Sequence, residues 1–402
     1  MKHIRKLADF YRTLASVLLN TIVLFVCLNA ALWVAFRVKD SFIGSQDPVL
    51  RRFEGINIEA VYPGLSRYEI EEILRETWGR PFVYEPFTQF KERPYQGRYV
   101  NVNQAGFRAS KDQGEWPPDP NNYNIFMFGG STLFGYCVAD DQTIPSHLQD
   151  FLWDHGQSQV RVYNFGRGFY YSTQERILFE ELLRAGFRPD MAIFVDGLND
   201  FYFVEDQPAM TSRLVESMSA GHKPPTGSKL AELALESRLP VCRLAKDLRS
   251  RIVRVRKDKD AAPREVQASS GLDGNEDATI SAIMSRYLEN KRLAETVAAE
   301  YGVVTVFVWQ PVPAYEYDLN CHLFSEWCLK HLSSSRHGLS GRGYAYIAKH
   351  WDKFTFGDDF LWLADMQRDR HEPLYIDIVH YTGSMCRLIA HATGVFLLEN
   401  HL

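Results

Sequence analysis

From about residue 123 onward, short runs of consecutive apolar residues alternate with longer stretches whose apolar residues recur at helical spacing. Each run ends at glycine or polar residues, as expected where a buried strand ends. Runs that are apolar at every position are typical of strands covered on both faces, and the helices between them join the strands in parallel. The sequence therefore predicts an α/β fold, a three-layer α/β/α sandwich with a mostly parallel sheet. The predicted strands are residues 124–128, 160–164, 191–195 and 303–309.

The predicted helices between these strands carry their own start and stop signals. Asp141 or Thr143 is positioned to cap the first helix. The segment Ser172-Thr173-Gln174-Glu175 has the form of a capping box and is expected to open the second. A longer helical pattern stops at Gly302, directly before the last predicted strand. Each signal lies where the strand pattern requires a helix to begin or end.

The N-terminus departs from this pattern, because residues 14–36 are dominated by apolar side chains. A helix of that length spans a bilayer. A cleavable signal peptide has a shorter apolar stretch that ends in small residues, so we interpret the segment as an uncleaved transmembrane anchor. Basic residues are more frequent before the segment than after it, which predicts that residues 1–13 are cytoplasmic. These basic residues are Lys2, Arg5, Lys6 and Arg12 before it, and Arg37 and Lys39 after it.

The remainder of the chain would then lie outside the cytoplasm. The sequence contains no Asn-x-Ser/Thr glycosylation site, which favours a bacterial periplasm over a secretory pathway. We therefore expect a single-pass protein of the bacterial inner membrane, with its larger part in the periplasm.

Two regions stand outside the strand and helix alternation. Residues 40–122 are rich in aromatic side chains without a clean period, and we expect an N-terminal extension that packs on the core, or else a sugar-binding rim. Residues 201–278 form an inserted helical and loop region. Within it, residues 241–257 have a basic amphipathic pattern. This pattern predicts a solvated helix face or, alternatively, a surface for anionic lipids or polysaccharides.

Charge and cysteine content exclude some classes of function. A net charge of −5 over 402 residues argues against a nucleic-acid-binding protein. The six cysteines lack the spacing of a metal site, and we expect neither a metal nor a cofactor. In an exported domain, Cys321 and Cys328 could close a disulfide loop or remain two buried thiols.

Four short segments carry side chains suited to acyl chemistry. A hydroxyl nucleophile needs a base, an acid that orients the base, and donors for the oxyanion. A carboxylate three residues before an imidazole can accept its Nδ1 proton, so that Nε2 faces a serine. Three of the segments follow predicted strands, at the edge where parallel sheets bind ligands. The segments are Gly129-Gly130-Ser131-Thr132, Asn164-Phe165-Gly166, Gly197-Leu198-Asn199-Asp200 and Asp377-Ile378-Val379-His380.

In this order, the four segments resemble the blocks of the SGNH (GDSL-type) hydrolase superfamily, and the chain resembles its membrane-anchored bacterial members. The resemblance covers roughly residues 123–398. It implies a flavodoxin-like hydrolase domain at 123–402, interrupted by the insertion described above. Gly130 departs from the family pattern, because it replaces the aspartate of the Gly-Asp-Ser-Leu form. Residues 103–108 are similar to a segment that precedes the first block in anchored members, without an evident physical role.

The resemblance also implies a role for individual residues. Ser131 would be the nucleophile, Asp377 the acid and His380 the base. The oxyanion hole would consist of the backbone N–H groups of Ser131 and Gly166 and the side-chain amide of Asn199.

Three further polar residues lie close to these segments and are candidates for substrate contacts. They are Asp200, Gln174 and Gln310. An aspartate at the end of a strand more often caps the following turn, so a structural role is the alternative for each of them.

Together, these features predict a membrane-anchored, outward-facing serine esterase that forms an acyl-enzyme on Ser131. Its substrate would be an acylated carbohydrate or cell-envelope polymer, with O-acetyl as the expected group. Its other partners would be the membrane and proteins of polysaccharide assembly. One alternative is an O-acyltransferase that modifies an exopolysaccharide through the same site. The second is a non-catalytic envelope scaffold or glycan-binding module.

Overall fold

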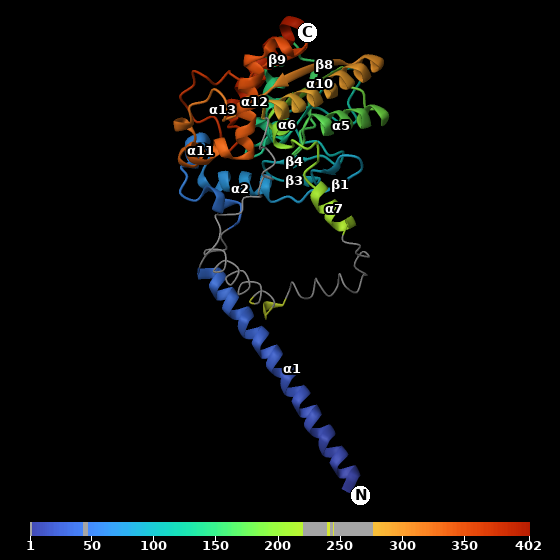
Figure 1. Cartoon of the computed structure of the whole chain (residues 1–402), viewed down its shortest axis with the longest axis vertical. Helices are drawn as coiled ribbons and strands as arrows, with labels where there is room; N and C mark the ends of the chain where they lie inside the picture. Colours follow the sequence, from blue (N-terminus) through green and yellow to red (C-terminus); the bar gives the residue numbers. More distant parts are fainter. Residues whose placement is uncertain (1, 43–46, 220–238, 242–243, 245–275) are drawn as a thin grey trace. The chain divides into compact units, whose positions relative to one another are not determined.

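The computed structural model describes residues 2–42, 47–219, 239–241, 244 and 276–402 (Figure 1). Most of the predicted basic helix at 241–257 lies outside these residues. The chain divides into two compact units, each of two segments. The first unit comprises Met1–Asp47 and Val215–Gln267, and the second comprises Pro48–Leu214 and Ala268–Leu402.

The first unit contains the long helix α1 (Lys2–Phe42). Its stretch Asp9–Val38 is long and apolar enough to cross a membrane, judged by length and composition. Asn29, a polar interruption of this stretch, donates its side-chain amide to the carbonyl of Phe25 at 2.9 Å. The amide N–H is therefore satisfied within the helix, whereas Asn29 Oδ1 accepts the backbone N–H of Val241 at 3.2 Å. A helix of this kind at an N-terminus serves as a membrane anchor or as a signal sequence.

The second unit is built on a five-stranded parallel sheet with the order β6-β5-β7-β8-β9. Numbered along the sheet's own strands, this is the order 2-1-3-4-5 of flavodoxin-like folds. The first four strands confirm the predicted ones to within one residue at each end. The fifth, of only three residues, is too short to give a pattern in the sequence. The strands are β5 (Tyr123–Gly129), β6 (Val160–Asn164), β7 (Met191–Asp196), β8 (Val304–Trp309) and β9 (Phe360–Trp362).

Each face of the sheet has its own core, because successive side chains of a strand point to opposite faces. Ile125 and Met127 of β5 belong to one core, whereas Phe126 and Phe128 belong to the other. The predicted three-layer α/β/α sandwich is therefore confirmed. The covering helices are α4 (Ile144–Asp154) and α13 (Gly383–Asn400) on the first face, and α5 (Ser172–Arg184) and α10 (Glu276–Tyr301) on the second.

The helix starts agree only in part with the sequence signals. Thr143 caps α4, as one of the two predicted alternatives. The capping box predicted at the start of α5 is wrong, because the N-cap is Tyr171 and makes no side-chain capping bond. Ser172 is already helical, and its hydroxyl donates to Asp200 Oδ1 at 2.5 Å. Glu175 is buried instead of turning back to the helix start.

The region before the sheet contributes to both cores, because α2 (Arg67–Trp78) and the turns before it pack in the first core and Phe90 and Phe107 pack in the second. Helix α2 begins with a capping box between Ser66 and Glu69. Its residues Ile70, Ile73 and Leu74 join the cluster that contains α4 and α13. Two short antiparallel pairs complete this region, β1 (Val83–Glu85) with β2 (Gln89–Lys91), and β3 (Tyr95–Gln96) with β4 (Asn101–Val102).

The remaining elements are short, apart from α12, and most lie between a strand and the next covering helix. The α-helices among them are α3 (Ser131–Phe134), α6 (Leu198–Tyr202), α7 (Thr211–Ser219), α11 (Ser325–His331) and α12 (Arg336–Lys349). The 3-10 helices are η1 (Leu50–Phe53), η2 (Ile58–Val61), η3 (Asp140–Gln142), η4 (Leu319–Cys321), η5 (Leu332–Ser334) and η6 (Trp351–Lys353).

The five cysteines in the described residues are all free thiols. Cys328 is buried, and Cys321 has its Sγ 3.7 Å from Asp318 Oδ2. Cys321 and Cys328 therefore remain unpaired thiols in the structure and do not form the disulfide that was the other alternative.

Candidate active site

Ser131 is the first residue of α3, which begins directly where β5 ends. The backbone N–H of a first helical residue has no acceptor within its helix. Among the described residues, no hydrogen bond from the Ser131 N–H is found. The preceding residue, Gly130, lies so close to Asn199 that a Cβ there would collide with the amide Nδ2. Glycine in place of the aspartate of the Gly-Asp-Ser-Leu form therefore leaves room for this amide beside the serine.

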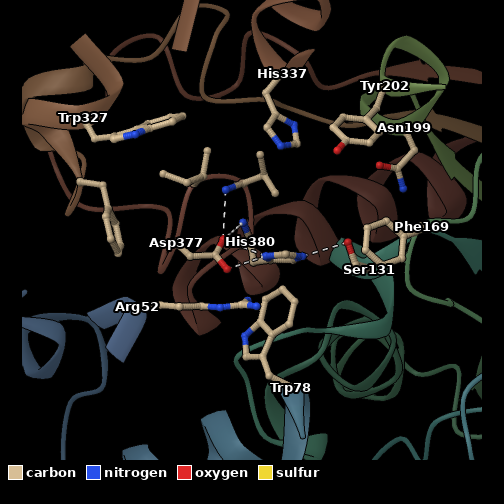
Figure 2. A pocket seen from close by; sticks show the side chains of 13 residues that line it. Arg52, Trp78, Ser131, Phe169, Asn199, Tyr202, Trp327, His337, Asp377 and His380 are labelled. Carbon is tan, nitrogen blue, oxygen red and sulfur yellow. Dashed lines mark hydrogen bonds and ion pairs between the residues drawn. The ribbon is translucent and has the colours of Figure 1, made fainter. Parts of the chain in front are cut away.

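The three side chains predicted as nucleophile, base and acid form one hydrogen-bonded row (Figure 2). His380 Nε2 lies 2.9 Å from Ser131 Oγ. His380 Nδ1 lies 2.8 Å from both carboxylate oxygens of Asp377. With the Nδ1 proton donated to the carboxylate, Nε2 is the nitrogen that can accept the serine proton. With Asp377 three residues before His380, the carboxylate thus reaches Nδ1 and Nε2 faces the serine, as expected from the sequence.

Asp377 is held as a carboxylate by its surroundings. Burial by itself would raise its pKa, but the charge and hydrogen bonds of His380 outweigh burial and hold the pKa well below its usual range. The backbone N–H groups of Val379 and His380 add to this effect, since both donate to Oδ1, at 3.1 and 2.9 Å. An ionised carboxylate only accepts hydrogen bonds, so it fixes the tautomer of the imidazole.

The acid and base are packed by residues that the sequence did not single out. The ring of Trp78 meets the His380 ring edge-on at 5.2 Å, and it stacks on Tyr136 at 4.8 Å. The Trp78 indole N–H donates to Cys137 Sγ at 3.2 Å, and this sulfur lies 3.9 Å from Asp377 Oδ2. Burial, followed by the Asp377 charge, raises the pKa of the Cys137 thiol well above its usual range. Cys137 therefore keeps its proton and presents it to Asp377.

Asn199 follows β7 and lies beside Ser131 at the same edge of the sheet (Figure 2). Its Nδ2 donates to the carbonyl of Tyr170 at 2.6 Å. A side-chain amide carries two N–H groups, so one remains for a ligand.

Gly166 lies differently from the prediction. Its N–H donates to Asn164 Oδ1 at 3.0 Å, and the Asn164 amide is oriented by the carbonyl of Leu133, also at 3.0 Å. Gly166 is buried, and it is absent from the cavity lining described below. A Cβ at this position would collide with the backbone N of Phe134, so glycine permits close packing on α3. The structure therefore does not bring this N–H to the cavity.

Phe169, from the same loop, lines the cavity that Gly166 does not reach. Its φ of 65° lies in the left-handed region, which is uncommon for a residue with a bulky side chain. Among the described residues, its N–H makes no hydrogen bond. The sequence did not single out Phe169, because its proximity to Gly166 and Gly168 is the only feature of the sequence that marks this position.

Two of the three candidate substrate contacts are buried away from the cavity. Asp200 accepts the Ser172 hydroxyl, and burial raises its pKa. Gln174 donates its Nε2 to the carbonyl of Thr88 at 2.8 Å. Neither residue lines the cavity. Both side chains turn inward because the start of α5 faces α6 and the region before the sheet.

The third candidate, Gln310, is also buried and outside the cavity lining. Its Oε1 accepts the hydroxyl groups of Thr132 at 2.6 Å and of Tyr381 at 3.0 Å. These are the residues that follow Ser131 and His380 in the chain. Gln310 therefore links the nucleophile and base segments instead of contacting substrate.

Arg108 gives a physical role to the segment 103–108. The side chain is fully buried, and it donates to the carbonyls of Phe134 at 2.8 Å and Val138 at 2.7 Å. Its Nε donates to Asp140 Oδ1 at 2.9 Å. The planar guanidinium thus ties the end of α3 to the following loop, which holds the helix that carries Ser131.

A cavity of about 400 Å³ opens over the row (Figure 2). Arg52 and Trp78, which precede the sheet, form part of its wall. His337 lies across the cavity and stacks on Tyr202 at 5.0 Å. Burial, and then the charge of His380, lowers the pKa of His337 to about 4, so this ring is neutral near pH 7. The aromatic lining residues are Trp78, Phe169, Tyr202, Phe324 and Trp327.

Two groups among the described residues bring atoms of metal-ligand type within 4.8 Å of one another. One consists of Cys137, Asp377 and His380, where the protonated thiol is a poor ligand and a metal would occupy the base. The other consists of Asp318, Cys321 and His371, and lies outside the cavity.

No protein-family model and no curated sequence matches this chain. Among solved structures, it is similar to the psychrotrophic esterase EstA from Pseudoalteromonas sp., with 10% identity over 69% of this chain and 98% of that one, and a TM-score of 0.34. The acetyl xylan esterase AlAXEase gives 12% identity, 67% and 97% coverage and a TM-score of 0.32. A member of the lipolytic protein G-D-S-L family from Veillonella parvula DSM 2008 gives 11% identity, 69% and 97% coverage and a TM-score of 0.32. Similarities of this size leave the activity to be argued from the chain's own residues.

Proposed function

We propose that this chain is a serine esterase of the SGNH type that forms an acyl-enzyme on Ser131. The observation that carries the proposal is the hydrogen-bonded row of Ser131, His380 and Asp377 at the floor of an aromatic cavity. A serine hydroxyl is a weak nucleophile until an adjacent base can take its proton. The row supplies that base, and the carboxylate stabilises the imidazolium that forms.

In the first half of the reaction, Ser131 Oγ attacks the ester carbonyl carbon while His380 Nε2 takes the hydroxyl proton. The developing oxyanion accepts hydrogen bonds from the Ser131 N–H and the second N–H of the Asn199 amide. We assign the third donor to the Phe169 N–H, because the Gly166 N–H is engaged by Asn164. The ester bond then breaks, and the departing alcohol takes the proton from His380.

In the second half, water attacks the acyl group on Ser131. His380 accepts a proton from the water, and the acid product leaves as the proton returns to Ser131 Oγ. Each half of the reaction uses the same base and the same oxyanion donors.

We further propose that the acyl group, in particular an acetyl group, is carried by a carbohydrate of the cell envelope. Aromatic rings along the cavity wall suit the flat, apolar faces of sugar rings. The apolar helix α1 would anchor the chain in the inner membrane, with the unit that contains the cavity on the outer side. Transfer of the acyl group to a sugar hydroxyl would use the same acyl-enzyme.

Hydrolysis of a chromogenic acetate ester by the full-length protein in detergent micelles tests the proposal. We expect Ser131→Ala to abolish turnover, whereas Ser158→Ala, at an exposed serine outside the cavity, keeps the activity of the unchanged protein. Equal rates for the unchanged protein and Ser131→Ala would refute the mechanism. Adding an acetyl donor together with an envelope glycan, and measuring acetate on the glycan, separates transfer from hydrolysis.

A further inference from the structure

Arg52 is a cation in the cavity wall that has no carboxylate partner among the described residues. It belongs to η1, is exposed, and places its guanidinium carbon 4.6 Å from the centroid of the Trp78 ring. Within the described parts of the chain, its side chain makes no hydrogen bond or ion pair. Stacking on an aromatic ring leaves the N–H edge of a guanidinium open to a ligand.

Arg336 is a second such cation near the same cavity. It is the first residue of α12, and its guanidinium carbon lies 5.6 Å from the centroid of the Tyr202 ring. The Tyr202 ring lines the cavity on the side across from Trp78 (Figure 2). As for Arg52, no ion pair of this side chain is found among the residues that the structure covers.

Several other arginines on the surface of this unit form ion pairs. Arg368 binds Glu316 at 2.9 Å, and Arg342 binds Glu276 at 2.8 Å. Among the described residues that line the cavity, Asp377 has the one carboxylate, and it is engaged in hydrogen bonds with the His380 imidazole and with the backbone N–H groups of Val379 and His380. In the described part of the chain, the cavity wall therefore combines the unpaired guanidinium of Arg52 with a single carboxylate that is already hydrogen-bonded, and an unpaired cation in a cleft attracts anions.

We propose that the ester substrate carries an anionic group, a carboxylate or a phosphate, which binds Arg52 while its sugar ring lies on the aromatic wall. This inference rests on the proposed function and narrows its substrate class to acylated anionic sugars. A guanidinium binds a carboxylate or a phosphate through two parallel N–H bonds, which fixes the orientation of the sugar as well as its charge. Arg336, set behind Tyr202, adds attraction at a greater distance.

Paired substrates test the inference in the full-length protein. Acetylated methyl glucoside is neutral, acetylated methyl glucuronide carries a carboxylate, and acetylated glucose 6-phosphate carries a phosphate. We expect kcat/KM to be at least about tenfold higher for one of the anionic esters, mainly through KM, as one charge-assisted hydrogen bond permits. The two anionic arms show which group the site prefers.

Substitutions then assign the selectivity to one side chain. Arg52→Gln should reduce the anionic-to-neutral ratio to near one while neutral ester hydrolysis continues, and Arg52→Lys should keep an intermediate ratio. Arg51→Gln is the matched control, because Arg51 is an exposed neighbour on η1 that does not line the cavity. A ratio near one in the unchanged protein, or a ratio that Arg52→Gln leaves intact, would overturn the inference.

A binding measurement tests the proposed anion site without requiring that the protein hydrolyses esters. The Ser131→Ala variant can be titrated with methyl glucuronide, glucose 6-phosphate and methyl glucoside while the tryptophan fluorescence of the protein, to which Trp78 and Trp327 in the cavity contribute, is followed. Tighter binding of an anionic sugar, lost in a Ser131→Ala and Arg52→Gln double variant, supports the site even if ester hydrolysis fails. Equal binding of all three sugars contradicts it even if hydrolysis succeeds.

Discussion

Two differently built parts of the molecule contribute to the cavity. The edge of the parallel sheet supplies Ser131 and Asn199, each on the turn that directly follows a strand. The residues before the sheet supply Arg52 and Trp78, from a 3-10 turn and the end of α2. The strand order fixes the first pair, because neighbouring parallel strands end at one edge. The positions of Arg52 and Trp78 depend instead on how the segment before the sheet packs against that edge. The reacting groups and the cavity wall can therefore vary independently.

Replacing the acid should give the largest effect at the sheet edge. We expect Asp377→Asn to lower kcat about 10⁴-fold, because an amide favours the wrong tautomer of His380. KM should change little. Steady-state kinetics with a chromogenic acetate ester measure both, and a loss below tenfold would mean that Asp377 does not orient the base.

The same variant makes a prediction about pH. The pKa of Asp377 is lower in the folded protein than the value of about 3.9 expected in the unfolded chain. Its stabilising contribution is therefore complete above that value and is lost as pH falls toward the folded pKa. Between pH 5 and pH 3, thermal unfolding should show a larger loss of stability in the unchanged protein than in Asp377→Asn.

Removing the oxyanion amide should have the next largest effect. We expect Asn199→Ala to lower kcat by about 10²-fold to 10³-fold with little change in KM, because the amide bonds to the oxyanion only as it forms. Gly130→Ala should resemble it, since its new Cβ would displace the same amide. Asn121→Ala, at an exposed site outside the cavity, is the control. An effect on KM alone would place Asn199 on the bound substrate instead.

The wall before the sheet should give the smallest effect. Trp78 makes an aromatic contact of about 1 kcal/mol with the base His380, so Trp78→Leu should lower kcat/KM about fivefold. Trp78→Phe should restore most of this loss. Trp351→Leu, at an exposed tryptophan outside the cavity, provides the baseline. A loss of activity as large as that of Asn199→Ala would show that the cavity wall and the sheet edge do not contribute independently to catalysis.

Much of the sheet edge could be predicted from the sequence. Apolar runs located β5 to β8, because full burial leaves a pattern in the residue types. The spacing of Asp377 and His380 allowed the two to be paired once the order of the four segments was considered, since the two residues lie on one turn of chain. Local pattern and local geometry, together with the order of the segments, were enough for these features.

The rest depends on contacts between distant parts of the chain. Phe169 lines the cavity through a backbone conformation that its residue type does not suggest. Arg52 and Trp78 reach the site through packing of a region without a regular period. Gln174 lies at the start of a predicted helix, and Gln310 directly follows a predicted strand. The side chain of each turns toward a hydrogen-bond partner far away in the sequence, Thr88 for Gln174 and Thr132 for Gln310.

The proposed mechanism requires that Ser131 is a nucleophile activated by His380. Treating the full-length protein with an organophosphorus ester, and locating the adduct by peptide mass spectrometry, tests this claim most directly. We expect one phosphorus adduct on Ser131, and none in His380→Ala at the same exposure. An unlabelled Ser131, or equal labelling in His380→Ala, would contradict the claim.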